Sequence, residues 1–315
     1  MKWATYRSDT ADRVGLVVDD EIRTLEGGIR LIDLLGDDGS RLHEAGERAQ
    51  RAPDAVVALR DAQLRAPIPA PPSIRDFFAF EQHAISGLKA LGLEINPGWY
   101  EIPVFYFTSP GAVLGSGDTV TFAGNAVELD FELEMAAIVG KPGRNLDPEE
   151  AKDHIAGYCV YNDWSARDLQ HLEMGITPIG PSKGKDFGNS LGPFLVTPDE
   201  IEAKRTGVTF DLAMIASVNG EEYGRGSLAD VYWGFHEMIS YASREADVRT
   251  GDVIGSGTCA RGCLMELRGS DGEDKYPWLK AGDEVSLEIE GIGTLRNTVA
   301  QGAMPKPLRP ARRKV

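Results

Sequence analysis

The sequence predicts an α+β fold in which strands predominate, with a small amino-terminal α/β domain and a larger strand-rich domain after it. A proline-rich segment, "RAPIPAPPS", interrupts the chain near residue 70, and alternating runs such as "VTFDLAMIASVNG" and "EVSLEIEGIGTL" dominate the rest of the chain. Alternation with a period of two is typical of half-buried strands. With 315 residues, 42% of them hydrophobic, the chain can fill one large core or two smaller ones.

Residues 1–70 are predicted to form the small domain. The runs "VGLVV" and "EIRTL" indicate short strands, and "DAVVALRDAQL", residues 54–64, is interpreted as helical. The four prolines between Pro67 and Pro72 fit neither a helix nor a central strand, so this segment is expected to be an extended linker.

The larger domain is expected to span residues 71–315. A few helices are predicted among its strands, at "DWSARDLQHLE" and "GFHEMISYASRE". The last stretch, residues 304–315, reads "MPKPLRPARRKV" and is biased enough to predict a loose basic tail.

Composition excludes several classes of protein. The formal net charge of -16 argues against nucleic-acid binding, which needs a basic face. No apolar run reaches the roughly 18 residues that span a bilayer, and the first residues lack the apolar centre of a signal peptide, so a cytoplasmic protein without membrane contact is expected. The cysteines are odd in number and lack C-x-x-C spacing, so we expect buried small hydrophobic residues at Cys159, Cys259 and Cys263.

The stretch "ELDFELEMAAIVG", residues 128–140, places an acid at every second position before an apolar run. In a strand, Glu128, Asp130, Glu132 and Glu134 would share one face at a spacing of about 6.6 Å. That face is either solvated or holds a cation, and the pattern alone leaves both open. Oxygen ligands with few histidines favour Mg²⁺, Ca²⁺ or Mn²⁺ over Zn²⁺.

Two other segments offer polar side chains with competing interpretations. In "CVYNDWSARDLQ" a predicted strand runs into a predicted helix, and Asp163 at the junction is either a helix N-cap or a ligand. In "RDFFAFEQH", Asp76 and His83 mean little by themselves, because a lone histidine is usually structural.

Taken together, the segments resemble the fumarylacetoacetate hydrolase family. The resemblance follows the family's order from residue 75 to about 267 and is carried by "RDFFAFEQH", "LDFELEMAAIVG", "YNDWSARDLQ", "GKDFGNSLGPF", "GSGT" and "LMEL". It implies a β-roll of layered sheets, a homodimer and a divalent metal. Members of the family cleave, decarboxylate, isomerise or hydrate small dicarbonyl acids, and aromatic catabolism is the expected setting.

The resemblance also implies roles for single residues. Four acids would hold the metal, leaving Glu128 and Asp130 on a solvated or loop-facing edge: Asp76, Glu132, Glu134 and Asp163. His83 would be the general base, oriented by Glu266. Negative charge that develops in the reaction would be bound by Arg167, Gln170 and Lys185. Substrate contacts would come from Tyr106 and Thr258, and from position 78, where this chain has Phe78 in place of the tyrosine of the hydrolase proper. Residues 88–101 would form a mobile lid.

These residue types suit the hydrolysis of a carbon–carbon bond in a 1,3-dicarbonyl acid. A histidine held in one tautomer by a carboxylate can activate water at neutral pH, and a Lewis-acidic ion, Mg²⁺ being the first choice, can stabilise the enolate that departs. The alternatives are a decarboxylase, isomerase or hydratase acting at the same site. A non-catalytic domain braced by its ion is the alternative of another class.

Three further motifs resemble known functional patterns, but each lacks a feature that its pattern requires. "GNSLG" matches the nucleophile pattern of serine hydrolases, but a strand is predicted after it where a helix is required. "GPSKGKD" has one residue too few for a phosphate loop, and "GSGTCARG" lacks the third glycine of a dinucleotide site.

Overall fold

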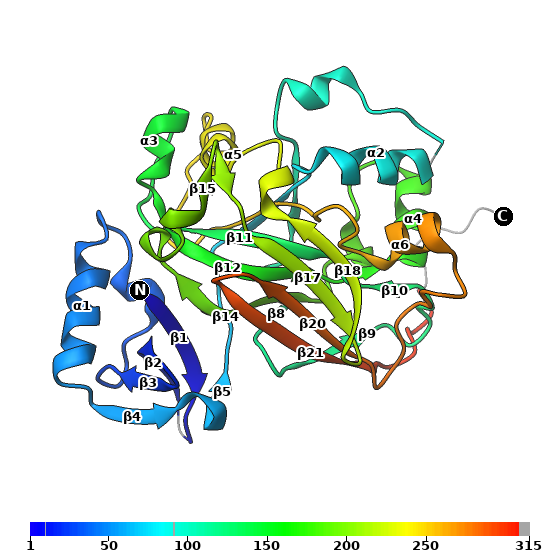
Figure 1. Ribbon diagram of the computed structural model, residues 1–315. Coiled ribbons are helices and arrows are strands. Elements are labelled where there is room, and N and C mark those ends of the chain that lie inside the picture. Colours follow the sequence, from blue (N-terminus) through cyan, green and yellow to red (C-terminus); the bar gives the residue numbers. More distant parts are fainter. Residues whose placement is uncertain (10, 91, 309–315) are drawn as a thin grey trace.

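The computed structural model describes residues 1–9, 11–90 and 92–308, and its centre is a mixed sheet that runs from the amino-terminal unit into the larger one (Figure 1). In order across the sheet the strands are β4 (Ala55–Ala58), β3 (Glu21–Thr24), β2 (Asp12–Val18), β1 (Lys2–Arg7), β14 (Asn189–Val196), β12 (Ile155–Asp163), β11 (Leu133–Val139), β19 (Val253–Gly255), β6 (Ile74–Phe77) and β7 (Phe105–Thr108). Two short strands join its side, β5 (Gln63–Leu64) on β1 and β8 (Val113–Leu114) on β14.

A second, smaller sheet packs against the first. Its order is β18 (Glu221–Ser227), β17 (Ala213–Val218), β20 (Glu284–Ile289), β21 (Gly293–Gln301) and β9 (Thr119–Phe122). Short pairs are formed by β10 (Leu129–Asp130) with β13 (Ser165–Ala166), and by β15 (Arg205–Thr206) with β16 (Thr209–Phe210). The α+β, predominantly β fold predicted from the sequence is confirmed.

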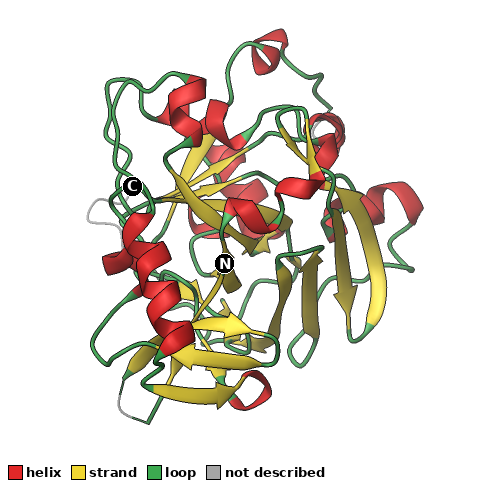
Figure 2. Ribbon diagram, turned by 60° about the vertical axis from the view of Figure 1, so that its left-hand side comes forward, coloured by secondary structure: helices red, strands yellow, loops and turns green. Residues whose placement is uncertain are grey.

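The helices lie outside these layers (Figure 2). They are α1 (Ser40–Arg51), α2 (Glu81–Ala90), α3 (Pro148–Lys152), α4 (Arg167–Ile176), α5 (Phe235–Ala242) and α6 (Leu264–Asp271). Helices α2, α4 and α6 gather at one end of the main sheet (Figure 1). Among the described residues, no helix is long and apolar enough to cross a membrane.

The number of covered faces explains in which strands apolar and polar residues alternate along the sequence. In β17 and β20 buried positions alternate with more exposed ones, because one face of each strand packs on the core. In β11 every residue is buried, since one face contributes Met135 and Ala137 to the core between the sheets and the other contributes Ala136 and Ile138 to a second core beneath α1. A strand covered on both faces becomes a continuous apolar run.

One predicted element is wrong. Residues 54–64 are not a helix but contain β4, one 3₁₀ turn and β5. The backbone of Val56 and Val57 pairs with β3, and β-branched side chains tolerate that extended conformation well. Tertiary pairing therefore overrides the helical interpretation. The proline-rich segment has no helix or strand, and Ala66 and Ile68 within it pack into the second core.

Candidate active site

A cavity of about 390 Å³ opens at the end of the main sheet where α2, α4 and α6 gather. Most of the site residues named from the sequence line it: Asp76, Phe78, His83, Tyr106, Glu132, Glu134, Arg167, Gln170, Lys185 and Thr258. The two others, Asp163 and Glu266, contact this lining through hydrogen bonds. Residues up to 190 positions apart in the sequence thus meet at one place.

Neighbouring strands of the main sheet supply much of this lining. Asp76 lies on β6, Tyr106 pairs with it from β7, and Glu134 lies on β11. Strand β19 runs between β6 and β11, and there Gly255 leaves room for the carboxylate: a Cβ at this position would lie 2.4 Å from Oδ1 of Asp76. The glycine is therefore required by a close approach of the acid.

Four buried carboxylates converge at the cavity, and we call them the acid cluster: Asp76, Glu132, Glu134 and Asp163. Each offers an oxygen within 4.8 Å of the others. Oδ1 of Asp76 and Oδ1 of Asp163 are buried, and neither has a hydrogen-bond partner in the described part of the chain. Buried polar atoms are normally satisfied, so these two oxygens fit the ligand shell of an oxygen-preferring divalent cation.

The pKa values of the acid cluster also indicate that these carboxylates lack enough positive charge around them. Burial, and then the neighbouring acids, raise the pKa of Asp76 and of Glu134 well above the usual range of carboxyl groups. Burial also raises the pKa of Asp163, although Lys185 opposes the shift. A bound cation would favour the ionised form of all three.

Glu132 differs from the rest of the acid cluster because two cations contact it. Lys185 Nζ donates to Glu132 Oε2 and, over 2.6 Å, to Asp163 Oδ2, while Arg167 Nη2 donates to Glu132 Oε1 over 2.7 Å. Burial alone would raise the pKa of Glu132, but Lys185 and Arg167 outweigh burial and hold it well below its ordinary value. Both cations therefore favour the ionised form of Glu132.

His83 and Glu266 form a buried pair beside the acid cluster. Nδ1 of His83, on α2, shares a hydrogen bond with Oε1 of Glu266, on α6. The other carboxylate oxygen accepts the backbone N–H of Arg261 over 2.5 Å. The ring of Phe78 stands edge-on to the imidazole, with 5.2 Å between ring centroids. With Nδ1 occupied, Nε2 is the nitrogen left for a molecule in the cavity.

Helix α4 presents Arg167 and Gln170 from one face, as their spacing predicts. Arg167 Nη1 donates to Gln170 Oε1 over 3.0 Å, and Arg167 Nε donates to Asp130 Oδ2 over 2.9 Å. Burial would lower the pKa of Arg167, but Asp130 and Glu132 raise it well above its ordinary value. Burial raises the pKa of Asp130, and Arg167 opposes that rise.

Tyr106 and Thr258 both contact the acid cluster. The hydroxyl of Tyr106 donates to Asp163 Oδ2, and that of Thr258 donates to Glu134 Oε1 over 3.3 Å. The backbone N–H of Gly257 donates to the other oxygen of Glu134 over 3.0 Å. These donors orient carboxylates, so a substrate contact from either hydroxyl stays a prediction.

The structure corrects two interpretations of single acids. Asp130 does not lie on a solvated edge, because its side chain is fully buried. The row of acids does not run along one strand face either: β10 ends at Asp130 and β11 begins at Leu133. Asp163 is not an N-cap, since α4 begins four residues later, at Arg167. Glu128 is partly exposed, as expected.

Four further expectations concern other parts of the chain. Ser190 lies within β14 and accepts a hydrogen bond from Trp164 Nε1 over 2.9 Å, in agreement with a structural role. The three cysteines are free and buried, as expected. Residues 309–315 of the predicted basic tail lie outside the described residues. Residue 91, within the predicted lid of residues 88–101, also lies outside the described residues. The motion of this lid stays a prediction.

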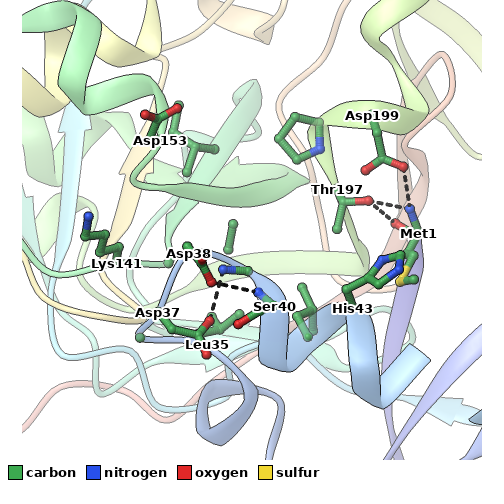
Figure 3. A pocket seen from close by; sticks show the side chains of 17 residues that line it. Met1, Leu35, Asp37, Asp38, Ser40, His43, Lys141, Asp153, Thr197 and Asp199 are labelled. Carbon is green, nitrogen blue, oxygen red and sulfur yellow. Dashed lines mark hydrogen bonds and ion pairs between the residues drawn. The ribbon is translucent and has the colours of Figure 1, made fainter. Parts of the chain in front are cut away.

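A larger cavity, of about 650 Å³, lies between the start of α1 and two loops of the larger unit (Figure 3). Its polar groups bond mainly to one another: the amino group of Met1 to Asp199, and the backbone N–H of Ser40 to Asp38. The side chains of His43 and Lys141 at its rim are exposed. Perturbed, buried acids gather in the smaller cavity, and there we place the chemistry.

Sequence reasoning missed one buried residue of the site, Asp130. Besides Arg167, it accepts the backbone N–H groups of Leu264 and Met265. These partners lie 134 and 135 positions away in the sequence. No signal within "ELDFELEMAAIVG" could have found them.

The fold agrees with a direct comparison to known proteins. The model of the fumarylacetoacetate (FAA) hydrolase C-terminal domain matches residues 73–300. The chain belongs to the fumarylacetoacetate hydrolase family, an enzyme family whose members include hydrolases, isomerases and tautomerases of small acids.

Individual relatives catalyse different reactions. A fumarylacetoacetase of Arabidopsis thaliana is 31% identical over 242 residues, which cover 61% of this chain and 57% of that protein, so the chain spans little more than half of its length. The oxaloacetate tautomerase YisK of Bacillus subtilis is 29% identical over 95% of this chain and 100% of that protein. The structure of maleylpyruvate hydrolase from Sphingobium sp. SYK-6 with manganese(II) and pyruvate shares the fold, with a TM-score of 0.72 at 23% identity, covering 96% of this chain and 100% of that one.

Proposed function

We propose that the protein is a divalent-metal-dependent hydrolase that cleaves a carbon–carbon bond in a small 1,3-dicarbonyl acid of the acylpyruvate or fumarylacetoacetate type. The observation that carries the proposal is the buried His83–Glu266 pair, which faces the same cavity as the acid cluster. A base for activating water and a set of ligands for a Lewis acid are the two requirements of this reaction.

The acid cluster would hold the metal through Asp76, Glu132, Glu134 and Asp163. Support comes from the two orphaned oxygens and from the all-oxygen ligand set, which suits Mg²⁺, Mn²⁺ or Ca²⁺. The manganese of the maleylpyruvate hydrolase structure is compatible with this choice. When bound, such an ion supplies a Lewis acid for the oxygens of a dicarbonyl acid.

His83 would act as the general base. Glu266 fixes its ring and favours the proton on Nδ1, so that Nε2 can take a proton from water in the cavity. The hydroxide then attacks the carbonyl carbon, the electrons of the carbon–carbon bond leave with the departing enolate, and the proton on His83 returns to that fragment. Water is the only co-reactant.

Arg167, Gln170 and Lys185 would stabilise the oxyanion that forms during the attack. The contacts of Arg167 and Lys185 with Glu132 hold both cations in place before substrate arrives. Donors that are fixed in advance stabilise developing charge without reorganising, and each contributes about 10²-fold or more to the rate.

The lining of the cavity narrows the choice of substrate. Phe78 has no hydroxyl to hold a second carboxylate, which favours an acylpyruvate over fumarylacetoacetate itself. Tyr106 and Thr258 remain the proposed substrate contacts. A homodimer in the cytoplasm is also proposed, and light scattering of the purified protein would check the dimer.

A tautomerase or another isomerase of a 2-oxo acid is the second candidate. It is favoured by the Bacillus relative, an oxaloacetate tautomerase that matches 95% of this chain. Tautomerisation needs a base and an enolate site but no water, so the products separate the two functions.

The test is an assay of the metal-loaded protein against acylpyruvates, oxaloacetate and fumarylacetoacetate. Hydrolysis of an acylpyruvate to pyruvate and a second acid supports the proposal. His83→Ala should lower kcat by roughly 10²-fold or more, whereas the control His43→Ala, at the rim of the other cavity, should not. Turnover of oxaloacetate alone would favour the second candidate. If His83→Ala left turnover unchanged, His83 would not be the base, and if none of these acids were turned over, the metal would serve only to brace the fold.

A further inference from the structure

We propose that Asp130 is a positioning residue that locks the guanidinium of Arg167 and the helix carrying Glu266 into one unit. The inference rests on the proposed function, because Asp130 would act through groups that are proposed to act in the reaction. It does not itself line the cavity.

Asp130 is completely buried and joins two helices that are distant in the sequence. Its Oδ1 accepts the backbone N–H of Leu264 over 2.7 Å, and its Oδ2 accepts that of Met265 over 3.1 Å. Oδ2 also accepts a hydrogen bond from Arg167 Nε over 2.9 Å and lies 2.8 Å from Arg167 Nη2. One carboxylate therefore meets the first turn of α6 and the first residue of α4.

The contact with α6 fixes the position of Glu266. Leu264 and Met265 are the first two residues of this helix, and their N–H groups have no partner within the helix. A carboxylate that accepts them defines where α6 begins and favours its dipole. Glu266 follows immediately and holds His83, so a shift of the first turn moves the proposed base.

The contact with α4 fixes Arg167 beside the acid cluster. Arg167 is 2% exposed and lies between Asp130 and Glu132. Bonds to both acids hold the guanidinium in one plane, since its donors are arranged in a rigid fork. Strand pairing supports the arrangement, because Asp130 pairs with Ser165 just before α4 begins.

An amide could not replace this carboxylate. The four N–H groups around Asp130 require acceptors on both oxygens, whereas Asn would direct its NH₂ group at donors on one side. Asp130→Asn must therefore lose either the hydrogen bond from Leu264 or those from both Met265 and Arg167. The change keeps the size of the side chain and leaves the acid cluster intact.

The chain offers a matched control in a second buried Asp–Arg pair. Asp252 is 1% exposed, receives Arg75 Nη1 over 3.0 Å, and accepts the backbone N–H of Arg249 over 2.9 Å. Neither Arg75 nor Asp252 lines the active-site cavity. Asp252→Asn should disturb folding as Asp130→Asn does, without affecting the reaction.

The experiment compares Asp130→Asn with Asp252→Asn in the metal-loaded full chain. On the acid that the unaltered protein turns over fastest, Asp130→Asn should lower kcat about 10- to 100-fold with a smaller change in KM, because Arg167 and His83 act mainly in the transition state. Asp252→Asn should leave kcat within about threefold, the spread that independent distant sites show. Equal losses of kcat in both variants would overturn the proposal.

A second readout does not need turnover. The proton shared by His83 and Glu266 should give a low-field proton resonance, assigned by its loss in His83→Gln, and Asp130→Asn should shift or remove it while Asp252→Asn does not. If this pattern is seen but no acid is turned over, the proposed function fails and the positioning role stands. If turnover is seen and the resonance is unchanged in Asp130→Asn, the positioning role fails. Should Asp130→Asn not fold, Asp130→Glu keeps the charge beside Arg167 and carries the same expectations.

Discussion

Two kinds of buried acid lie in or beside the active site of this protein. Asp130 meets N–H donors on both of its oxygens, whereas Asp76 and Asp163, in the acid cluster, each keep an oxygen that has no partner among the described residues. Burial alone therefore does not distinguish a structural acid from a metal ligand. What distinguishes Asp130 from Asp76 and Asp163 is whether the protein itself satisfies both carboxylate oxygens.

The largest expected effects are opposite responses of stability in the metal-free protein. Asp130→Asn should lower the free energy of unfolding by about 3–5 kcal/mol, because it leaves Arg167 as a buried charge with one partner fewer. Glu134→Gln should leave that free energy unchanged or raise it, since the ionised carboxylate is disfavoured by its surroundings and Gln can still accept from Gly257. Chemical denaturation in the presence of a chelator measures both.

Activity should respond differently from stability. With metal present, Glu134→Gln should reduce turnover by at least about 10²-fold, because a ligand of the Lewis acid is lost. The contrast between the two kinds of acid fails if Glu134→Gln destabilises the metal-free protein as much as Asp130→Asn does.

The next effect is on the pH dependence of stability. In the metal-free protein the pKa values of Asp76 and Glu134 lie above those of the unfolded chain. From about pH 4 up to these raised pKa values, the folded state therefore binds more protons than the unfolded state does. Their contribution to stability is therefore full below about pH 4 and is lost as the pH rises, by up to about 1.4 kcal/mol per pH unit and group. Mg²⁺ should reverse this loss, and at 100 times its Kd it should add about 2.7 kcal/mol.

Thermal denaturation at several pH values, with and without Mg²⁺, measures this prediction. The difference between the two curves should widen from about pH 5 to pH 8, since the ligands must be ionised to bind. Glu134→Gln serves as the control, because it removes one of the acids whose pKa is raised. A difference that stays constant with pH would show that the acid cluster does not bind the ion.

Part of the fold was predictable because some strands show their buried and exposed faces directly in the alternation of their own residues. Strands β17 and β20 alternate between buried and exposed positions, and their sequences alternate too. In β11 and the last seven residues of β12 both faces are covered, so the acids on these strands have no solvent-exposed face to occupy. The mistaken helix at residues 54–64 has a related cause, because pairing with β3 decides the conformation there.

The site was predictable only through the family resemblance. Asp76 and Glu134 lie 58 positions apart, and only the register of β6, β19 and β11 brings them together. The position of Asp130 could not be predicted, because the N–H groups that bind it belong to α6, more than 130 positions away. Such contacts are products of tertiary packing and leave no mark on the neighbouring sequence.

The smallest expected effect comes from moving an acid of the cluster without removing it. In Gly255→Ala the new Cβ would lie 2.4 Å from Asp76 Oδ1 and 2.9 Å from the ring of Tyr161, both closer than real contacts allow. Asp76 must then shift while all four carboxylates remain, so the affinity for Mg²⁺ should fall about 10- to 100-fold, as it does when the support of a ligand is lost.

Calorimetric titration of the metal-free protein with Mg²⁺ measures this change. Gly27→Ala is the control, since nothing lies within 4 Å of its Cβ and its φ lies outside the left-handed region. Asp130 keeps all of its partners in Gly255→Ala, so the low-field resonance of His83 should persist while metal affinity falls. If both were lost together, the acid cluster and the Asp130 contacts would have to be treated as one unit, because the clash would then have spread beyond Asp76.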